Sequence, residues 1–209
     1  MINELQQLFI QAFPELDASG QQQATKLYEL LAKGQPVPVA QLAEEISLTE
    51  DETAQLLHSW TGVSFNDEKL INGFWGVSTD ETGHRFHIGE QTLYTWCAWD
   101  LLFMPHLFHQ TVEAETSCPI TRQSIRLTIS EKGIEETQPE APLITFIKPD
   151  LEALKANVTH SFCQYIFFTA SEEAGKEWKE TQKDGFLISL DQGFELGQKI
   201  ISQVFNAKK

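Results

Sequence analysis

The sequence has no run of apolar residues long enough to cross a lipid bilayer, which takes about 20 of them in a helix. Its first stretch, MINELQQLFIQAF, lacks the basic segment and the small-residue cleavage site of a secretory signal. We therefore expect a cytoplasmic protein with no membrane partner.

Cysteine is scarce, with Cys97, Cys118 and Cys163 as its three instances. The number is odd and the spacings are wide, which excludes the disulfide framework of a small secreted domain. We expect free thiols in a reducing compartment. A buried cysteine most simply serves as a small hydrophobic side chain. Chemistry at any of the three therefore needs a further argument.

Basic residues are also scarce: 15 lysines and arginines face 30 aspartates and glutamates, a formal net charge of −15. This charge repels phosphate backbones and argues against nucleic acid as a partner. Apolar residues are plentiful, at 41% of the 209 residues, with 11% aromatic. The chain can therefore build a sizeable core, as one large domain or two small ones.

The first ninety residues have the pattern of short helices followed by a hairpin. Apolar residues at helical spacing, and one capping box, predict helices over 5–13, 27–31, 42–46 and from Thr49–Glu52 to Trp60. Short alternating runs over 66–88 predict a β-hairpin or meander. We interpret residues 1–90 as a winged-helix-like helical module.

Winged helices often bind DNA, but a fold does not fix a function. Residues 1–90 contain 14 acidic and 4 basic residues, and the predicted recognition helix opens with the acidic run TEDE. A DNA-binding surface needs the opposite sign of charge. We therefore predict a structural module without a role in nucleic-acid binding.

The remainder, residues 91–209, has the pattern of an α+β domain. Helices are predicted over 93–109, 171–180 and 191–204, and strands over 111–117, 124–130, 142–147, 160–170 and 185–190. The strand over 160–170 is the most hydrophobic and is expected to lie at the centre. We predict a mixed or antiparallel sheet with packed helices.

Two of these apolar segments carry reactive groups. Cys97 and Asp100 lie in LYTWCAWDLLF, residues 93–103, and would share one face of a helix at i, i+3. Cys163 lies in HSFCQYIFFTA, and in a strand it would point the same way as Ser161 and Tyr165. Packing of the helix on the strand would join two thiols and a carboxylate. A carboxylate in such surroundings is costly unless it is paired or protonated, which argues against a purely structural role.

A site with two thiolates selects soft metals. The paired C-x-x-C spacing of structural zinc is missing. The histidines offer little: His84 and His87 would face opposite sides of a strand, and His106 and His109 have no thiol or carboxylate beside them in sequence. His160 lies near Cys163, but neighbouring strand positions do not aim side chains at each other. Motifs for phosphate loops, dinucleotides and serine nucleophiles are missing too.

The residues themselves therefore leave more than one function open. A non-catalytic protein that binds or senses a soft metal through Cys97 and Cys163 fits the same pattern. A regulator built on the winged-helix module is a further alternative, against which the acidic charge of residues 1–90 argues.

Three stretches, LYTWCAWDLLFMPHLF, HSFCQYIFF and GFELGQ, resemble motifs of the organomercurial lyases, also called alkylmercury lyases. The resemblance covers most of residues 30–205, where LAKGQPVPVAQLA matches the family's helical module. In that family the first motif supplies a cysteine and an aspartate, and the second motif supplies another cysteine. These match Cys97, Asp100 and Cys163. Cys118 matches a position regarded as structural, and Gln164 replaces a further, inessential cysteine.

The resemblance implies protonolysis of the carbon–mercury bond of R–Hg⁺ to give R–H and Hg(II). Cys97 and Cys163 would bind mercury, and Asp100 would take up a thiol proton and deliver it to the leaving carbon. Hg(II) would stay on both cysteines with Asp100 nearby. No organic cofactor is implied. Small cytosolic thiols would help to strip Hg(II) from the site, and a mercuric reductase would be the next protein to receive it.

Overall fold

The computed structural model describes residues 2–182 and 184–205, so residues 206–209 of the predicted second domain lie outside the described residues. Over these described residues the chain is a mixed α and β structure with two antiparallel sheets. The larger sheet consists of β1 Val63–Phe65, β2 Ile71–Phe74, β3 Val77–Ser78, β4 Arg85–Ile88, β5 Gln91–Thr95, β6 Val112–Ser117, β7 Ser124–Ser130 and β8 Gly133–Gln138, in the order β1-β2-β3-β5-β4-β6-β7-β8. The smaller sheet has the order β10-β9-β11, from β9 Leu143–Ile147, β10 Phe168–Thr169 and β11 Gly185–Ser189.

The helices in the described part of the chain are α1 Ile2–Ala12, α2 Ala18–Leu31, α3 Val39–Ile46, α4 Glu50–Ser59, α5 Met104–Phe108, α6 Leu151–Ser161, α7 Glu172–Thr181 and α8 Leu190–Phe205. The 3₁₀ turns there are η1 Trp99–Leu102 and η2 Cys163–Tyr165. None of the helices in the described residues combines the length and the apolar character that crossing a bilayer requires.

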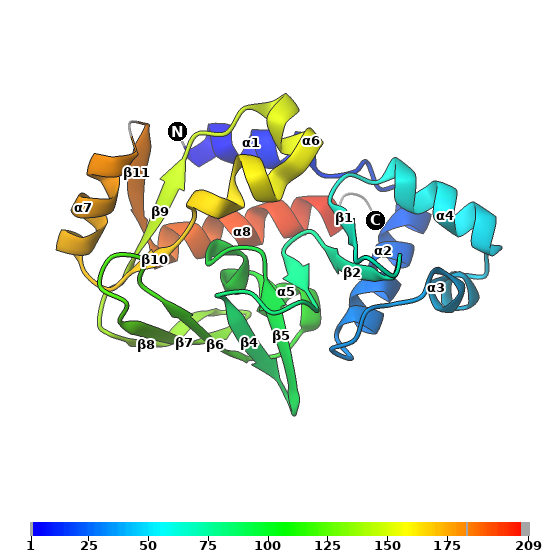
Figure 1. Cartoon of the computed structure of the whole chain (residues 1–209), viewed down its shortest axis with the longest axis horizontal. Helices are drawn as coiled ribbons and strands as arrows, with labels where there is room; N and C mark the ends of the chain where they lie inside the picture. Colours follow the sequence, from blue (N-terminus) through cyan, green and yellow to red (C-terminus); the bar gives the residue numbers. More distant parts are fainter. Residues whose placement is uncertain (1, 183, 206–209) are drawn as a thin grey trace.

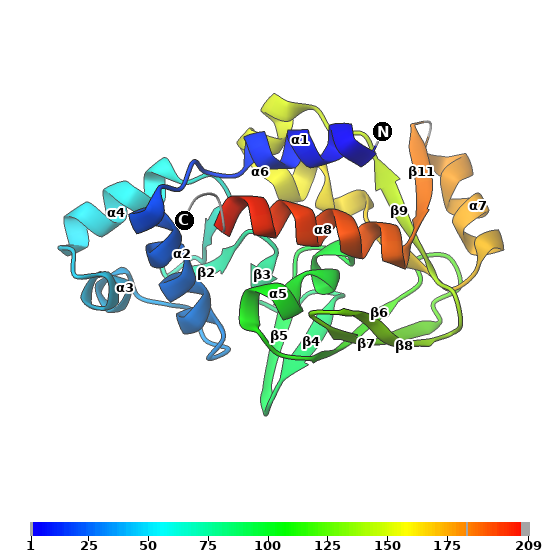
Figure 2. The same cartoon turned by 180° about the vertical axis from the view of Figure 1, so that it is seen from behind.

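Helix α8 runs through the middle of the molecule (Figures 1 and 2). Helices α1 and α6 lie on one side of it, and α5 and the larger sheet lie on the other. Its buried residues Leu196, Ile200 and Ile201 follow helical spacing and face this surrounding core. The functional site described below forms where η1, α1, α6 and α8 meet.

The helices predicted for the amino-terminal part are confirmed as α1 to α4. The capping box at the start of α4 is confirmed as well: the Glu52 N–H donates to Oγ1 of Thr49 at 3.2 Å, and the Thr49 N–H donates to Oε2 of Glu52 at 2.9 Å. Strand β4 pairs with β6, so the larger sheet continues across the predicted boundary at residues 90 and 91. The two-domain division and the winged-helix module stay predictions.

Several elements of the second half are also confirmed. The predicted strands over 111–117, 124–130, 142–147 and 185–190 are β6, β7, β9 and β11, and the predicted helices over 171–180 and 191–204 are α7 and α8. Burial alternates along β6 and β7, which is the strand period that made them predictable. Strand β8 and helix α6 were not predicted.

The helix predicted over 93–109 is confirmed in its last part, as α5, and is wrong over residues 93–103. Residues 93–95 end strand β5, and residues 99–102 form the 3₁₀ turn η1 before α5. Leu93 and Thr95 are fully buried, whereas Tyr94 between them is partly exposed, which is the alternation of a strand. A continuous apolar run does not distinguish a strand from a helix by its period, and that ambiguity produced the error.

The central strand predicted over 160–170 is wrong as well. Helix α6 ends at Ser161, η2 follows, and the strand β10 consists of Phe168–Thr169 at the edge of the smaller sheet. The central strand of the smaller sheet is β9.

Helix α6 begins after Asp150, whose Oδ1 accepts a hydrogen bond from the Ala153 N–H at 3.0 Å. The sequence contains this cap. The apolar residues after Ser161 nevertheless have the composition of a buried strand, so the end of α6 and the turn η2 were not predicted.

Candidate active site

Cys97 lies in a tight turn between β5 and η1, and side chains hold both of its peptide groups. The Thr95 hydroxyl donates to the carbonyl of Cys97 at 2.8 Å. The N–H of Cys97 donates to Oδ2 of Asp100 at 2.9 Å. Asp100 thus caps the turn that carries Cys97, in the manner of an Asx side chain bonding nearby backbone. The thiol and the carboxylate are fixed relative to one another.

Cys163 reaches the same place from another part of the chain, as the first residue of η2. The N–H of Ala98 donates to the carbonyl of Ile166 at 3.4 Å, which joins the turn after β5 to the residues that follow η2. The Ile166 N–H in turn donates to the carbonyl of Cys163 at 3.0 Å. Backbone contacts therefore hold the two cysteine-bearing segments side by side.

The structure brings the three predicted residues together, although neither predicted element around them exists. One ligand atom each from Cys97, Asp100 and Cys163 lies within 4.8 Å of the others. Their exposed fractions are 0%, 6% and 4%. Over residues 2–182 and 184–205, no other group of three His, Cys, Asp or Glu side chains comes as close together. Two thiols and one carboxylate form a donor set suited to a soft metal ion.

Burial controls the protonation of this cluster. It raises the pKa of Asp100 to about 7, against the opposing effect of hydrogen bonds from the backbone and side chain of Cys97. Burial, the hydrogen bond to Cys163 and the charge of Asp100 raise the pKa of Cys97 well above its ordinary value. For Cys163, the hydrogen bond from Cys97 favours the thiolate, but burial and Asp100 outweigh it and raise the pKa. Asp100 is therefore a carboxylate able to hold a proton near neutral pH.

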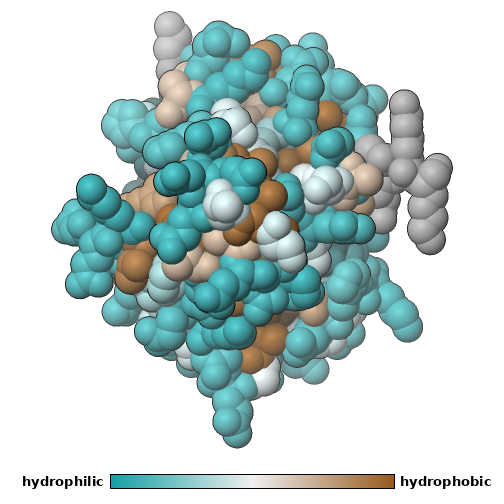
Figure 3. Space-filling view, turned by 90° about the vertical axis from the view of Figure 1, so that its right-hand side faces the viewer, coloured by the Kyte–Doolittle hydropathy of each residue, from teal (hydrophilic) through white to brown (hydrophobic). Residues whose placement is uncertain are grey.

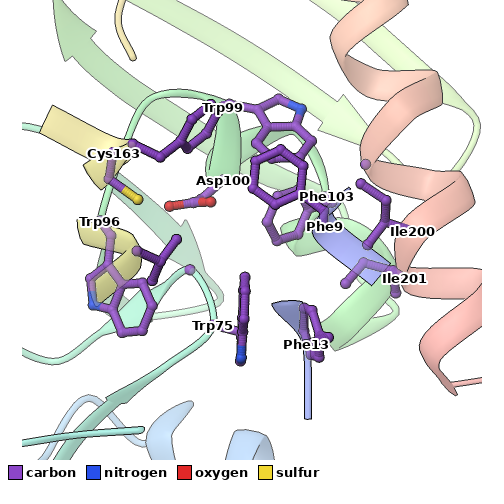
Figure 4. Close-up of a pocket in the computed structure, with 14 residues that line it drawn as sticks. Phe9, Phe13, Trp75, Trp96, Trp99, Asp100, Phe103, Cys163, Ile200 and Ile201 are labelled. Atoms are coloured by element: carbon purple, nitrogen blue, oxygen red, sulfur yellow. The ribbon is translucent and has the colours of Figure 1, made fainter. Parts of the chain in front are cut away.

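A small apolar cavity of about 20 Å³ adjoins Asp100 and Cys163. Figure 4 shows aromatic side chains around it, including Trp75, Trp96 and Phe13. The remaining lining residues lie in α1, η1, α6 and α8 or directly after η1 and α6: they are Phe9, Trp99, Phe103, Val158, Phe162, Gly197, Ile200 and Ile201, with Gly76 beside Trp75. Such a wall excludes water and admits an apolar group next to the carboxylate.

The glycines of GFELGQ have a packing role next to this site. The carbonyl of Gly193 accepts a hydrogen bond from the Trp99 indole N–H at 2.8 Å. A Cβ added at Gly197 would lie 2.9 Å from the Phe103 ring. Glycine at these positions lets α8 approach the segment that contains Asp100.

The sequence pattern did not identify Trp75, Gly76 and Phe13 as part of the site. The pair Trp75–Gly76 forms the turn between β2 and β3, with φ values of 26° and 93°. Glycine after an aromatic run was a visible turn signal, but nothing in the sequence placed that turn against Asp100. A Cβ added at Gly76 would lie 3.2 Å from the carboxyl carbon of Asp100.

The other candidate groups lie outside the cluster. His84 is buried and its ring Nδ1 lies 2.7 Å from the Thr116 hydroxyl, and burial lowers its pKa to about 4. Burial alone would raise the pKa of the Cys118 thiol, but hydrogen bonds, chiefly from Thr121, lower it. All three cysteines are free. Cys118 and the histidines add no ligand to the three residues of the site.

Comparison with known proteins decides the family. The model of the family MerB, alkylmercury lyase, matches residues 77–202. The chain belongs to the alkylmercury lyase family. The alkylmercury lyase of Staphylococcus epidermidis is 30% identical over 174 residues, which are 83% of this chain and 79% of that protein. The enzyme of Pseudomonas putida is 28% identical, over 83% of this chain and 80% of its own.

A solved structure has the same fold. The mercury-bound form of MerB2 superposes with a TM-score of 0.81 and covers 97% of this chain and 99% of its own, at 21% identity. The matched family residues 77–202 include Cys97, Asp100 and Cys163. The family comparison thus agrees with the resemblance of the sequence motifs, and the solved structure shows the same fold.

Proposed function

We propose that this chain cleaves the carbon–mercury bond of organomercurial cations R–Hg⁺, releasing R–H and retaining Hg(II). Cys97 and Cys163 are the mercury ligands and Asp100 is the proton donor. The observation that carries the proposal is the buried cluster of these three side chains, within 4.8 Å of one another beside an apolar cavity. The membership of the chain in the alkylmercury lyase family supports it.

The reaction balances without any further reactant. One cysteine thiol loses its proton to solvent, and its sulfur displaces the ligand with which R–Hg⁺ arrived. Asp100 then takes the proton of the other thiol, whose sulfur also bonds to mercury. Two thiolates raise the electron density on mercury, and the carbon–mercury bond breaks with its electron pair on carbon. Asp100 returns the proton to that carbon, and R–H leaves.

The environment of Asp100 suits this double role. A carboxyl group with an ordinary pKa near 4 would be too weak a base to retain the proton of a thiol. Burial raises the pKa of Asp100 to about 7, so the group can hold a proton and release it at neutral pH. The organic group lies in a dry aromatic pocket, where charge interactions are stronger than in water.

Thiol chemistry indicates how Hg(II) leaves the site and is transferred to another protein. Two protein thiolates bind Hg(II) as a chelate, and small thiols are the soft ligands able to exchange with it. We propose small cytosolic thiols as the acceptors of Hg(II) and a mercuric reductase as the protein that next receives it. No organic cofactor takes part in the proposed steps, and the proposed location is the cytoplasm.

We further propose that residues 1–90 form a winged-helix-like module with a structural role, and residues 91–209 the catalytic domain. Helices α2, α3 and α4 followed by the β1–β2 pair support the first assignment. The acidic first turn of α4, with Glu50, Asp51 and Glu52, argues against contact with nucleic acid.

Formation of the hydrocarbon tests the enzymatic proposal. The purified protein is incubated with methylmercury and excess small thiol, and the headspace is analysed for methane by gas chromatography. Methane at many equivalents per chain supports the lyase. Binding of methylmercury without methane would overturn the lyase and favour the alternative, a non-catalytic mercury-binding protein with the same two thiols.

A further inference from the structure

The residues that line the cavity come from two parts of the chain. Cys97, Asp100 and Cys163 lie within residues 77–202, which the family model matches. Four residues of the wall precede that part: Phe9, Phe13, Trp75 and Gly76. All three reacting groups therefore lie inside the matched region, whereas part of the wall around the cavity lies outside it. This difference points to the unmatched part of the wall as the place where the choice of organic group is made.

Hydrogen bonds and ring stacking hold Trp75 firmly in this wall. Its indole N–H donates to the carbonyl of Thr61 at 2.9 Å, and its backbone N–H donates to the carbonyl of Gly62 at 3.2 Å. The buried Tyr28 hydroxyl donates to the Trp75 carbonyl at 3.2 Å. The ring stacks on Phe13 with centroids 4.1 Å apart and planes 19° apart. Hydrogen bonds at three points and a stacked ring fix this indole in place.

The surroundings leave Trp75 little room to move away from the cavity. A Cβ added at Gly62 would lie 2.4 Å from the indole nitrogen, so the backbone there is already in close contact. On the other side, Gly76 packs against Asp100. Figure 4 shows Trp75 and Phe13 side by side below Asp100. The indole is thus a rigid wall close to the carboxyl group that delivers the proton.

The small volume of the cavity limits the size of the organic group that this wall can accommodate. About 20 Å³ accommodates a group of about the size of one water molecule, whereas an apolar cavity that binds benzene measures on the order of 150 Å³. A methyl group fits with small adjustments of its neighbours. A phenyl group fits only if part of the wall is displaced, and Trp75 resists displacement.

We propose that Trp75 is a specificity-determining residue, a fixed wall that favours small alkyl groups over aryl groups on mercury. The inference rests on the proposed lyase function, since it concerns the organic group that this reaction releases. It assigns no chemical step to Trp75. Substitution of Trp75 changes the relative rates for large and small organic groups, because the wall acts on size.

The test compares two substrates in one enzyme preparation. For Trp75→Leu and the unsubstituted protein, kcat/KM is measured for methane release from methylmercury and for benzene release from phenylmercury. Comparing the phenyl-to-methyl ratio of kcat/KM between the two proteins cancels the difference in intrinsic reactivity of the two bonds. We expect the ratio to rise at least fivefold in Trp75→Leu. A smaller change would overturn the proposal.

Trp178→Leu is the matched control. Trp178 is 4% exposed against 5% for Trp75, and it lies in α7 away from the cavity lining. The same truncation there loosens the core without opening the wall, so the ratio should stay unchanged. A fivefold rise in this control as well would assign the effect to general loosening and contradict a specific role of Trp75.

A second variant covers the case in which Trp75→Leu does not fold. Trp75→Phe is a smaller change at the same position: it keeps an aromatic ring but removes the larger indole and its hydrogen bond to the Thr61 carbonyl. We expect its phenyl-to-methyl ratio to rise at least twofold, and an unchanged ratio in the folded variant would overturn the proposal. Absence of methane from the unsubstituted protein would instead overturn the lyase function itself, so the two failures are distinguishable.

Discussion

The backbone N–H of Cys97 donates a hydrogen bond to Oδ2 of Asp100 across 2.9 Å. An N–H group needs an acceptor, so this oxygen stays unprotonated while the bond persists. The proton that Asp100 carries in the proposed reaction therefore resides on its other oxygen, Oδ1. Since the same bond fixes the carboxyl group relative to the Cys97 thiol, proton transfer needs no rearrangement of the turn.

The two cysteines of the cluster should be individually essential. Cys97→Ser and Cys163→Ser each replace a soft thiolate by a hard, weakly binding hydroxyl of similar size. We expect hydrocarbon release from methylmercury to fall below detection while circular dichroism shows a folded chain. Full turnover by Cys163→Ser would remove the two-thiolate mechanism.

Cys118 is the matched control for these variants, since it is buried and lies outside the cluster. Cys118→Ser should lower the melting temperature through its buried surroundings and leave the activity of the folded protein close to normal. A folded but inactive Cys118→Ser protein would show that the reactive thiols have been assigned incorrectly.

Asp100→Asn should separate binding from turnover. The side-chain oxygen of asparagine can still accept the Cys97 N–H, but the amide has no carboxylic proton to deliver. We expect one equivalent of methylmercury bound per chain with no methane. Quenching of tryptophan fluorescence by the heavy atom measures binding, because Trp96 and Trp99 line the cavity. Normal turnover in this variant would mean that another group supplies the proton.

Asp100 should also make the folding stability depend on pH. Its pKa is 3.8 as an isolated group and about 7 in the folded chain, so the folded state binds more protons between these values. Its contribution to stability is therefore retained below about pH 4 and lost as the pH rises to about 7. The loss is on the order of a few kcal/mol. Asp100→Asn should consequently be more stable than the unsubstituted protein at pH 8.

Asp100→Asn must be compared with the unsubstituted protein, because His84 changes the pH dependence of folding stability in the opposite direction to Asp100. Its pKa is lowered from 6.5 to about 4, so its contribution to stability grows as the pH rises through this range. The free energy of unfolding of both proteins is measured in urea at pH 4.5 and pH 8. The difference between the two proteins at each pH cancels the contribution of His84, which they share. A stability difference that is the same at both pH values would contradict the raised pKa of Asp100.

The packing of α8 against the site is tested by Gly197→Ala. The added methyl group would lie 2.9 Å from the ring of Phe103, which lines the cavity. Overpacking of this kind costs typically about 1–3 kcal/mol, and displacement of Phe103 should lower turnover as well. Gly83→Ala is the control, since nothing lies within 4 Å of the added group. Equal effects of the two substitutions on unfolding would refute the packing argument.

The sequence predicted the meeting of Cys97, Asp100 and Cys163 more successfully than the secondary-structure elements that carry them. Cys97, Asp100 and Cys163 were found through residue chemistry and family motifs, which do not depend on secondary structure. The secondary structure around these residues was predicted wrongly because they lie in continuous apolar runs. A buried strand, a 3₁₀ turn and a helix end can share that composition. Alternating runs such as β6 and β7 and the capping box at Thr49 were predictable because their signals are local.

The wall of the cavity could not be predicted in the same way. Phe9, Phe13 and Trp75 meet the cluster only through tertiary packing, and each is an ordinary core residue by its type. The strand pairing of β4 with β6, which links the two predicted domains, is likewise a long-range contact. Such contacts are set by how the elements pack, and a single sequence carries no local signal for them.

Release of hydrocarbon in a single turnover tests the central claim most directly. The protein is mixed with an excess of methylmercury in the absence of added thiol, and methane is quantified. With Hg(II) retained by Cys97 and Cys163, we predict one methane per chain and then no more, with further methane on addition of excess thiol. No methane from the folded, mercury-bound protein would contradict protonolysis by Asp100 at this site.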